Sequence, residues 1–417
     1  MHAPFVGRTP DILRNDLQEG ELIMLASERK TEIVDLAKAL IARQSLSGQE
    51  KDAAEEWKRY LTAHGFDHVE TDRYGNVLGR IKGNRPGPRL LFDGHLDTVP
   101  AADPAAWTHP PFAPEEIDGR LYGRGASDMK GAVAAFTTAA GFFAADRGRD
   151  FAGEIWVAGV VHEECFEGVA ARSVSQIVRP DYVVIGEASA CNLKTGQRGR
   201  AEIVVETFGV PAHSANPEKG VNAVYAMCRV VEALRELEAP VHPVLGKGIL
   251  ELTDIRSSPY PGASVVPFYC RATYDRRLLV GETRESVLGP VRAALEELTA
   301  REPSIRAKVS FAQGEALCYT GETIRGERFF PGWLYGEEEP FVQAVLEELR
   351  GIGQDPRVTQ YSFCTNGSHY AGEAGIRTIG FGPSLESLAH TDDEYVETAQ
   401  LERACEGYYA IMRALLR

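Results

Sequence analysis

Apolar and polar positions follow two different patterns along the chain, and the change from one to the other divides the sequence. Over residues 31–186, apolar runs of strand length alternate with segments of helical periodicity. The predicted strands are residues 90–92, 155–161 and 182–185, and the predicted helices are residues 31–43, 132–145 and 170–178. Such alternation is typical of a parallel sheet that is covered by helices on both faces.

The alternation of strands and helices gives way to a different pattern after residue 199 and resumes near residue 320. Strict alternation at residues 201–208 and 267–277, with helical periodicity at residues 221–237 and 282–299, is typical of a half-exposed antiparallel sheet with helices on one side. A helix at residues 338–350, a strand at 378–381 and a helix at 398–416 then resume the α/β pattern. We therefore predict an α/β domain with a mostly parallel twisted sheet, formed by residues 1–198 and 321–417, and a smaller α+β domain inserted at residues 199–320.

Composition and charge narrow the classes of partner. The chain has 417 residues, with 45 Lys and Arg against 60 Asp and Glu, so its formal net charge is −15. A phosphate backbone or an anionic membrane surface would be repelled on average, and we expect no nucleic-acid or membrane partner. The longest small-apolar run, residues 132–145, also falls short of the ~20 residues that cross a bilayer.

The opening segment and the cysteines indicate a reducing compartment. Residues 1–13 include Arg8 and Asp11 but lack the apolar stretch that secretory signals contain, so we predict a cytoplasmic protein. The seven cysteines are odd in number, widely spaced and without a C-x-x-C pair, which argues against a disulfide framework and against a thiolate zinc site. A metal in this chain must therefore be held by His, Asp and Glu.

Histidines and carboxylates stand close to the ends of the predicted strands. In open parallel sheets, ligands bind outside the carboxyl ends of the strands, so these side chains are expected to meet at one edge. Each of them alone is explained most simply as a solvated loop residue. Together, their carboxylates need cations, because two like charges about 4 Å apart cost about 4 kcal/mol at an effective dielectric constant of about 20. The residues concerned are His95, Asp97, Asp128, Glu163, Glu164, Glu187 and His390.

Counting charges indicates two metal ions. The predicted ligands are two neutral histidines and three carboxylates: His95, His390, Asp128, Glu164 and Glu187. Three carboxylates and one bridging hydroxide carry four negative charges, which two divalent ions neutralise; we predict Zn²⁺, with Co²⁺ or Mn²⁺ as alternatives. The carboxylate of Asp97 would then fix the imidazole of His95 from behind, and Glu163 would remain as the general base.

Two familiar motifs are incomplete. Gly123-x-Gly125 is followed at the third residue by Asp128 where a dinucleotide fingerprint has glycine, and no predicted strand precedes it. His162-Glu163 begins like the zincin motif H-E-x-x-H, but Phe166 occupies the place of the second histidine. Neither a Rossmann site nor a zincin helix is expected.

Two alternatives with a covalent nucleophile remain. Ser127 and Lys130 match S-x-x-K, and residues 194–196 match K-T-G, as in serine acylases, although such short patterns often arise by chance. Cys165 lies beside the glutamates, whose charges would raise the pKa of its thiol and disfavour it as a nucleophile.

Five segments resemble, in order, the signatures of one enzyme family. They read L-F-D-G-H-L-D-T-V-P at residues 91–100, G-R-G-A-S-D-M-K-G at 123–131, H-E-E at 162–164, G-E at 186–187 and A-H-T at 389–391. From about residue 31 onwards the chain is similar to the acetylornithine deacetylase, succinyl-diaminopimelate desuccinylase, aminoacylase and carboxypeptidase G family of co-catalytic zinc hydrolases. The resemblance implies a zinc-exopeptidase-like fold whose inserted domain is a lid that forms a homodimer.

The resemblance also implies a role for each residue. One zinc would be held by His95 and Glu187 and the other by Glu164 and His390, with Asp128 bridging, Glu163 as base and Asp97 behind His95. His213, in V-P-A-H-S-A at residues 210–215, would reach the partner subunit's site and stabilise the oxyanion. Arg277, in the D-x-R of residues 275–277, would bind a substrate carboxylate.

Some positions differ from the common family pattern. Residues 264–267 read S-V-V-P where many relatives have Asn first, and residues 364–368 read C-T-N-G-S where G-G-T-D is common. We expect Asn366 to contact the substrate in a pocket of unusual shape. N-G at residues 366–367 and R-F-F-P at 328–331 resemble a subgroup linked to selenium metabolism, and Glu187 in place of Asp resembles the deacylases.

These observations predict a metal-dependent amidohydrolase. Its metal-bridging hydroxide would cleave the amide of a small N-acyl or N-carbamoyl amino acid. A dipeptidase or carboxypeptidase acting on dipeptides at the same binuclear site is the alternative. A metal-stabilised binding protein without activity is a third hypothesis, and the intact base and ligands argue against it.

Overall fold

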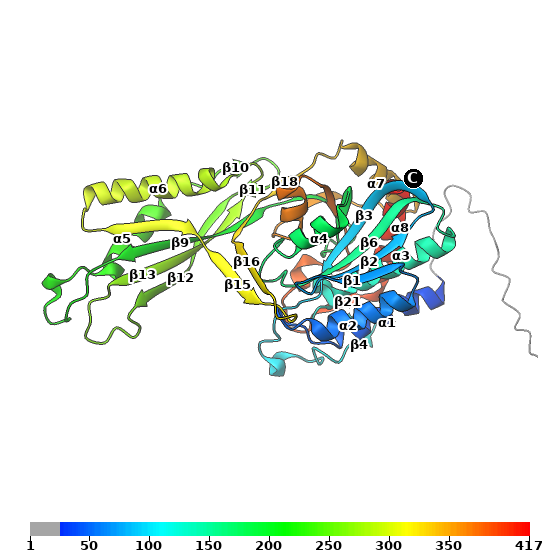
Figure 1. The fold of residues 1–417 in the computed structure, drawn as a ribbon, viewed down its shortest axis with the longest axis horizontal. Helices are drawn as coiled ribbons and strands as arrows, with labels where there is room; N and C mark the ends of the chain where they lie inside the picture. Colours follow the sequence, from blue (N-terminus) through cyan, green and yellow to red (C-terminus); the bar gives the residue numbers. More distant parts are fainter. Residues whose placement is uncertain (1–25) are drawn as a thin grey trace, which may run out of the picture.

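Two main sheets, each with its own helices, lie side by side in an elongated molecule (Figure 1). The computed structural model describes residues 26–417. The opening segment 1–13, in which we expect no secretory signal, therefore lies outside the described residues. Within the described range, no helix combines the length and the apolar character needed to cross a bilayer.

The larger sheet has parallel strands at its centre and antiparallel pairings towards both edges. The parallel centre consists of β6 (Ala152–Val160), β3 (Arg85–His95), β7 (Tyr182–Ile185) and β20 (Arg377–Gly380), in that order. The flanking strands are β1 (His68–Thr71), β2 (Val77–Lys82), β8 (Leu193–Gln197), β18 (Trp333–Leu334) and β19 (Val358–Tyr361). The carboxyl ends of the four central strands therefore meet at one edge.

Successive side chains of the central strands pack on opposite faces of this sheet. Phe92 and Val157 belong to the core under one set of helices, whereas Leu91 and Trp156 belong to the core under α4 (Ala171–Val178). The first set comprises α1 (Ser27–Ile41), α2 (Lys51–Ala63), α3 (Gly131–Asp146), α7 (Pro340–Gly351) and α8 (Thr398–Leu415). The predicted fold class, a mostly parallel sheet with helices on both faces and a smaller α+β unit, is confirmed.

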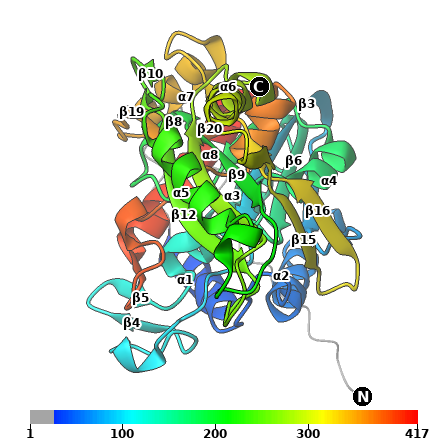
Figure 2. The same cartoon turned by 90° about the vertical axis from the view of Figure 1, so that its left-hand side faces the viewer.

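The second unit is built on the antiparallel order β12-β13-β9-β14. The strands are β12 (Ile249–Ser258), β13 (Tyr269–Leu278), β9 (Gly199–Phe208) and β14 (Arg306–Phe311). Ala201, Ile203 and Val205 alternate onto α5 (Ala223–Arg235) and α6 (Arg284–Arg301), which explains the period of two in the sequence. Figure 2 views the molecule from this end, with α5 in front.

A hairpin connects the two units. Its strands are β15 (Gln313–Leu317) and β16 (Thr323–Glu327). The turn between them contacts the larger unit, where the Tyr319 hydroxyl donates to the Gly75 carbonyl at 2.8 Å. β17 (Phe329–Phe330) pairs with β9. Residue 199 begins β9 and residue 320 lies in the hairpin turn. The remaining short strands are β4 (Glu115–Ile117), β5 (Arg120–Tyr122), β10 (Val241–His242), β11 (Gly246–Lys247) and β21 (Tyr395–Glu397).

Candidate metal centre

The predicted site residues come from five segments that meet at the carboxyl edge of the larger sheet. His95 is the last residue of β3, Glu163 and Glu164 follow β6, and Glu187 follows β7. Asp128 lies in an irregular turn just before α3, and His390 lies in the loop between β20 and β21. Because β6, β3 and β7 are neighbours in the sheet, their ends bring these side chains together.

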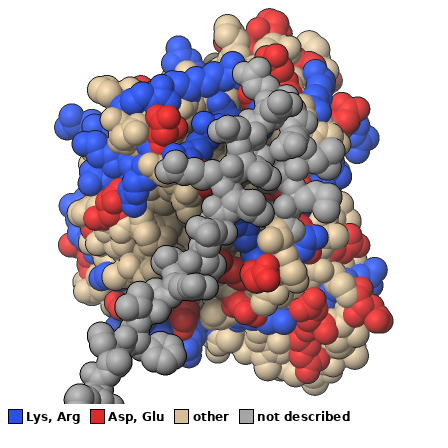
Figure 3. Space-filling view, turned by 90° about the vertical axis from the view of Figure 1, so that its right-hand side faces the viewer, with Lys and Arg blue, Asp and Glu red and all other residues tan. Residues whose placement is uncertain are grey.

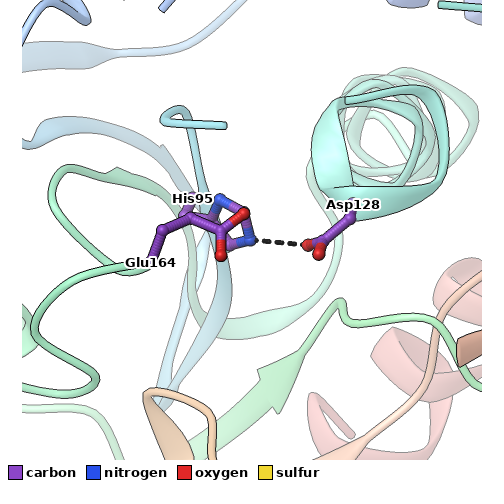
Figure 4. Close-up of side chains that lie close together, drawn as sticks. All are labelled: His95, Asp128 and Glu164. Carbon is purple, nitrogen blue, oxygen red and sulfur yellow. Dashed lines mark hydrogen bonds and ion pairs between the residues drawn. The ribbon is translucent and has the colours of Figure 1, made fainter. Parts of the chain in front are cut away.

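Asp128 stands between two histidines, and Figure 4 shows it facing His95, with Glu164 nearby. Its Oδ1 lies 2.9 Å from Nε2 of His95, and its Oδ2 lies 3.1 Å from Nε2 of His390. Nε2 of His390 is also 3.0 Å from Oε2 of Glu164, and Nε2 of His95 is 3.4 Å from Oε1 of Glu187. One carboxylate thus faces a histidine with each oxygen, as a bridging ligand would.

Two overlapping groups of side chains have the spacing of a metal site. Within each group, one potential ligand atom per residue lies within 4.8 Å of the others. The groups are His95, Asp128 and Glu164, and His95, Glu163 and Glu187. Glu163, which we expected to be free of metal, therefore shares a group with His95 and the predicted ligand Glu187.

The protonation equilibria of this cluster are strongly displaced. Burial opposes a charge on His95, yet hydrogen bonds with Asp128 and Glu187 hold its pKa well above the usual value. Hydrogen bonds with Asp128 and Glu164 raise the pKa of His390 to about 10. Burial raises the pKa of Glu187 to about 7 and raises the pKa of Glu163 well above its ordinary range. The cluster therefore binds positive charge, whether as protons or as metal ions.

The donor atoms fit divalent cations. The Oε1 atoms of Glu163 and Glu164 are buried and have no hydrogen-bond partner among the described residues. A buried acceptor without a partner costs about 1–3 kcal/mol, and more when it is charged. Imidazole nitrogen and carboxylate oxygen are common ligands of Zn²⁺, so cations bound between these residues would satisfy the orphaned oxygens.

Asp97 supports the cluster differently from our expectation. Nδ1 of His95 lies 2.8 Å from the main-chain carbonyl of Asp97, whereas the Asp97 carboxylate is 3.8 Å away. That carboxylate instead accepts hydrogen bonds from the main-chain N–H of Glu163 at 3.0 Å, the N–H of Glu164 at 3.1 Å and the Ser47 hydroxyl at 2.8 Å. Because three donors draw the carboxylate away from the ring, the carbonyl fixes the imidazole and the side chain fixes the glutamate turn.

Asn366 is not placed to contact a substrate. Its side chain is buried, with Nδ2 donating to Asp93 at 2.9 Å and Oδ1 accepting from the Gly168 N–H at 2.8 Å. The expected substrate contact is therefore corrected: Asn366 ties its loop to β3 from within the protein.

His213 and Arg277 lie in the second unit. Arg277 is on β13 and pairs with Asp275 of the same strand at 3.0 Å. His213 is exposed, and its Nδ1 accepts the N–H of Ala215 at 3.0 Å. His213 follows β9, which begins directly after β8 of the larger sheet and whose ten residues span about 30 Å, so within its own chain His213 lies far along the second unit.

The residues of the covalent alternatives do not assemble. The Ser127 hydroxyl donates to the Leu385 carbonyl at 3.4 Å, and Nζ of Lys130 donates to the Arg43 carbonyl at 2.7 Å. Lys194 pairs with Glu386 at 2.7 Å. Burial raises the pKa of the Cys165 thiol, with further contributions from nearby carboxylates. Neither a serine nor a cysteine nucleophile is organised here.

Two buried carboxylates that support the cluster were missed from the sequence. Glu394 accepts the main-chain N–H groups of the turn that carries Asp128, and Glu50 accepts the N–H of His162 at 3.1 Å. Both residues have no exposed surface. Each stands in a polar stretch of sequence that is typical of a solvated loop, so no local signal distinguishes them.

Comparison with known proteins identifies the family. The model of peptidase family M20/M25/M40 matches residues 91–414. The uncharacterized protein YgeY of Escherichia coli (strain K12) is 34% identical over 395 residues, which cover 93% of this chain and 95% of YgeY. Succinyl-diaminopimelate desuccinylase of Cereibacter sphaeroides (strain ATCC 17025) is 30% identical over 397 residues, which cover 91% of this chain and 98% of that enzyme.

A solved structure shows the same fold. Aminopeptidase PepT from Bacillus cereus superposes with a TM-score of 0.71 at 18% identity, over 93% of this chain and 98% of PepT. The chain therefore belongs to peptidase family M20/M25/M40, and the resemblance noted from its motifs is confirmed. Membership makes it a hydrolase of amide or peptide bonds.

Metal binding should displace protons from the cluster. Because His390 has a pKa of about 10, it carries a proton near neutral pH that must leave before its nitrogen can bind a metal. We expect zinc binding near pH 7.5 to release at least about one proton per chain, so that zinc affinity falls about a hundredfold or more between about pH 8 and pH 6. Calorimetry in buffers of different ionisation enthalpy measures both; an affinity independent of pH would contradict the assignment of His390 as a ligand.

Proposed function

We propose that this chain is a divalent-metal-dependent amidohydrolase that removes the acyl group from a small N-acyl or N-carbamoyl amino acid. The observation that carries the proposal is the cluster in which Asp128 faces one histidine with each carboxylate oxygen while Glu163 and Glu164 each keep one buried oxygen without a partner. Two metal ions per chain, with zinc as the proposed metal, would match the charge of this cluster.

The ligands would be His95 and Glu187 on one side, Glu164 and His390 on the other, and Asp128 between them. When bound, such ions polarise a carbonyl group and lower the pKa of water. Glu163 would accept the proton of the attacking water and deliver it to the leaving amine. Its position supports this role, because it is buried near His95 and burial raises its pKa, so that its carboxylate accepts a proton more readily than an exposed glutamate does.

The curated relatives whose names state a substrate favour acylated amino acids over dipeptides. Several curated relatives at 28–30% identity are named succinyl-diaminopimelate desuccinylase. The solved structures of named peptidases share 14–18% identity with this chain, which supports a common fold and no particular substrate. Arg277 is the proposed contact for the substrate carboxylate, for which the substrate would replace Asp275 as its partner.

A homodimer through the second unit is proposed on the basis of its surface. Among residues 26–417, β12 pairs with β13 alone and so presents an open edge, and exposed apolar side chains gather on this unit. They include Tyr225, Ile255, Tyr260, Val265 and Phe268. The domain limits proposed for this unit remain residues 199–320, inserted between residues 1–198 and 321–417.

We propose that the protein acts in the cytoplasm and that it has no nucleic-acid partner. All seven cysteines are unpaired, which suits a reducing environment. The net charge of −15 disfavours anionic partners. At the end of the larger unit that faces away from the second unit, basic side chains are most concentrated at the upper left of the view, and basic and acidic side chains are interspersed elsewhere (Figure 3).

The substrate class can be tested with zinc-loaded protein and a panel of N-acetyl, N-succinyl and N-carbamoyl amino acids alongside matched dipeptides. We expect an acylated amino acid to be cleaved with a kcat/KM at least about tenfold above that of any dipeptide, a difference of about 1.4 kcal/mol. Mass spectrometry of the released amino acid measures the reaction. Preference for dipeptides would favour the peptidase alternative, and no cleavage of either class would contradict the proposal.

Substitutions of the two adjacent glutamates provide the matched control. Glu163→Gln should retain both metals and lose about 10²- to 10⁴-fold in kcat, because an amide cannot accept the proton. Glu164→Gln should instead weaken metal binding, because it removes a charged ligand. Equal loss of metal in both variants, measured by elemental analysis after desalting, would contradict this division of roles.

The proposed action of His213 across a dimer can be tested by mixing two inactive variants. His213→Ala should lose about 10²- to 10³-fold in rate, as expected for one oxyanion donor. In a heterodimer of His213→Ala and Glu163→Gln, one site would regain both groups, so mixing should restore up to about half of the wild-type activity per dimer. No recovery after subunit exchange, confirmed by native mass spectrometry, would mean that His213 does not act in trans.

A further inference from the structure

Glu394 makes an unusually complete set of hydrogen bonds to a single turn. Its Oε1 accepts the main-chain N–H of Ser127 at 2.7 Å and the N–H of Asp128 at 2.9 Å. Its Oε2 accepts the N–H of Gly125 at 3.2 Å and Nη1 of Arg124 at 2.6 Å. All four donors belong to residues 124–128, and the carboxylate has no exposed surface.

The local fold brings this carboxylate to the turn. β21 begins directly after Glu394 and pairs with β5, with Tyr395 opposite Tyr122. β5 in turn leads into the turn that carries Asp128. The main-chain carbonyl of Glu394 adds a further contact by accepting the Gly123 N–H at 2.9 Å. The register of two short strands therefore determines where Glu394 meets the turn.

The same loop also supplies a cluster histidine. His390 precedes Glu394 by four residues, and its Nε2 lies 3.1 Å from Oδ2 of Asp128. Asp128 is thus held by its main chain to Glu394 and by its side chain to His390. A shift of Glu394 would move the Asp128 carboxylate relative to His95, whose Nε2 lies 2.9 Å from Oδ1.

Glu394 itself is not placed as a metal ligand. Both of its oxygens are occupied by two donors each, and the Asp128 carboxylate faces the two histidines. Arg124 balances its buried charge, with both side chains almost completely inaccessible. Glu394 therefore acts on the cluster only through the backbone of the turn.

We propose that Glu394 is a positioning residue that sets the affinity of the Asp128 site for its divalent cations by fixing the turn at residues 124–128. This inference rests on the proposed function, because it assumes that Asp128 is a ligand. A ligand that the folded protein already holds in the right orientation binds a metal more tightly, because it loses less conformational freedom on binding. Loss of a hydrogen-bond partner that orients a ligand typically costs 10- to 100-fold in metal affinity.

Glu394→Gln is a sharp test because no orientation of the amide fits. Each oxygen of Glu394 accepts two donors, so either placement of the amide NH₂ sets it against two donors. We expect zinc affinity, measured by competition with a chromophoric chelator, to fall about 10- to 100-fold.

Glu373→Gln is the matched control. Glu373 also pairs with a single arginine at 2.6 Å, Arg172, but its other partner is His369 at 2.8 Å, which is not one of the cluster residues. We expect this variant to lower the Tm of the metal-free protein while leaving zinc affinity within about twofold of wild type. Glu394→Gln should lower both.

Three results would decide the matter. Zinc affinity within twofold of wild type in Glu394→Gln would overturn the inference. If Glu394→Gln does not fold, Glu394→Asp is the deciding variant, since it keeps the charge but retracts the carboxylate by one methylene. Weaker zinc binding in Glu394→Asp than in Glu373→Gln would support the inference. Equal zinc binding in the two variants would overturn it. If wild-type protein binds no divalent ion, the proposed function fails instead, which separates the two claims.

Discussion

The constraint on which this structure depends is the concentration of negative charge at one edge of the larger sheet. Four carboxylates converge there in a site that is largely shielded from solvent: Asp128, Glu163, Glu164 and Glu187. Their mutual repulsion would be costly without positive charge. The raised pKa values of His95 and His390 are the response of the protein's own groups to this field. The binuclear cation site that we propose would resolve the repulsion and order the ligands at the same time.

Buried carboxylates fix the backbone beside the proposed ligands by accepting hydrogen bonds from its N–H groups. Asp97 accepts the N–H groups of Glu163 and Glu164, and Glu394 accepts those of the turn that bears Asp128. Hydrogen bonds to an ionised carboxylate are roughly twice as strong as those between neutral groups, so they fix these backbone segments firmly. The side chains of the cluster are therefore free to face the cation while their backbones are fixed.

The architecture was largely predictable because the hydrophobic patterns that mark its strands and helices lie within short stretches of sequence. The central strands β3, β6 and β7 are continuous apolar runs, and α3 is apolar on all sides because it lies between the sheet and α8. α2 was missed because only Ala53, Ala54, Trp57 and Leu61 of its thirteen residues are buried. β12 was missed because most of its residues are exposed, so it shows little of the alternation that marks β9.

The convergence of the site residues at one sheet edge was also predictable, since it follows from strand order. Contacts that depend on tertiary packing were not: Asn366 turns inward to Asp93, Asp97 turns its carboxylate to the glutamate turn, and Glu394 is buried although its neighbours in sequence are acidic. A single sequence contains no pattern that distinguishes a buried acceptor of N–H groups from a solvated carboxylate. The roles of His213 and Arg277 depend on a partner subunit or a substrate and stay predictions.

The central claim is that this carboxylate cluster holds two divalent ions per chain. Metal-free protein loaded with excess zinc and then desalted should contain close to two zinc ions per chain by elemental analysis, because a single ion leaves about two negative charges of the ligand set uncompensated. Calorimetric titration should give the same stoichiometry, and Asp128→Ala should reduce it because both ions share that ligand. A firm plateau at one zinc per chain, unchanged in Asp128→Ala, would contradict the account.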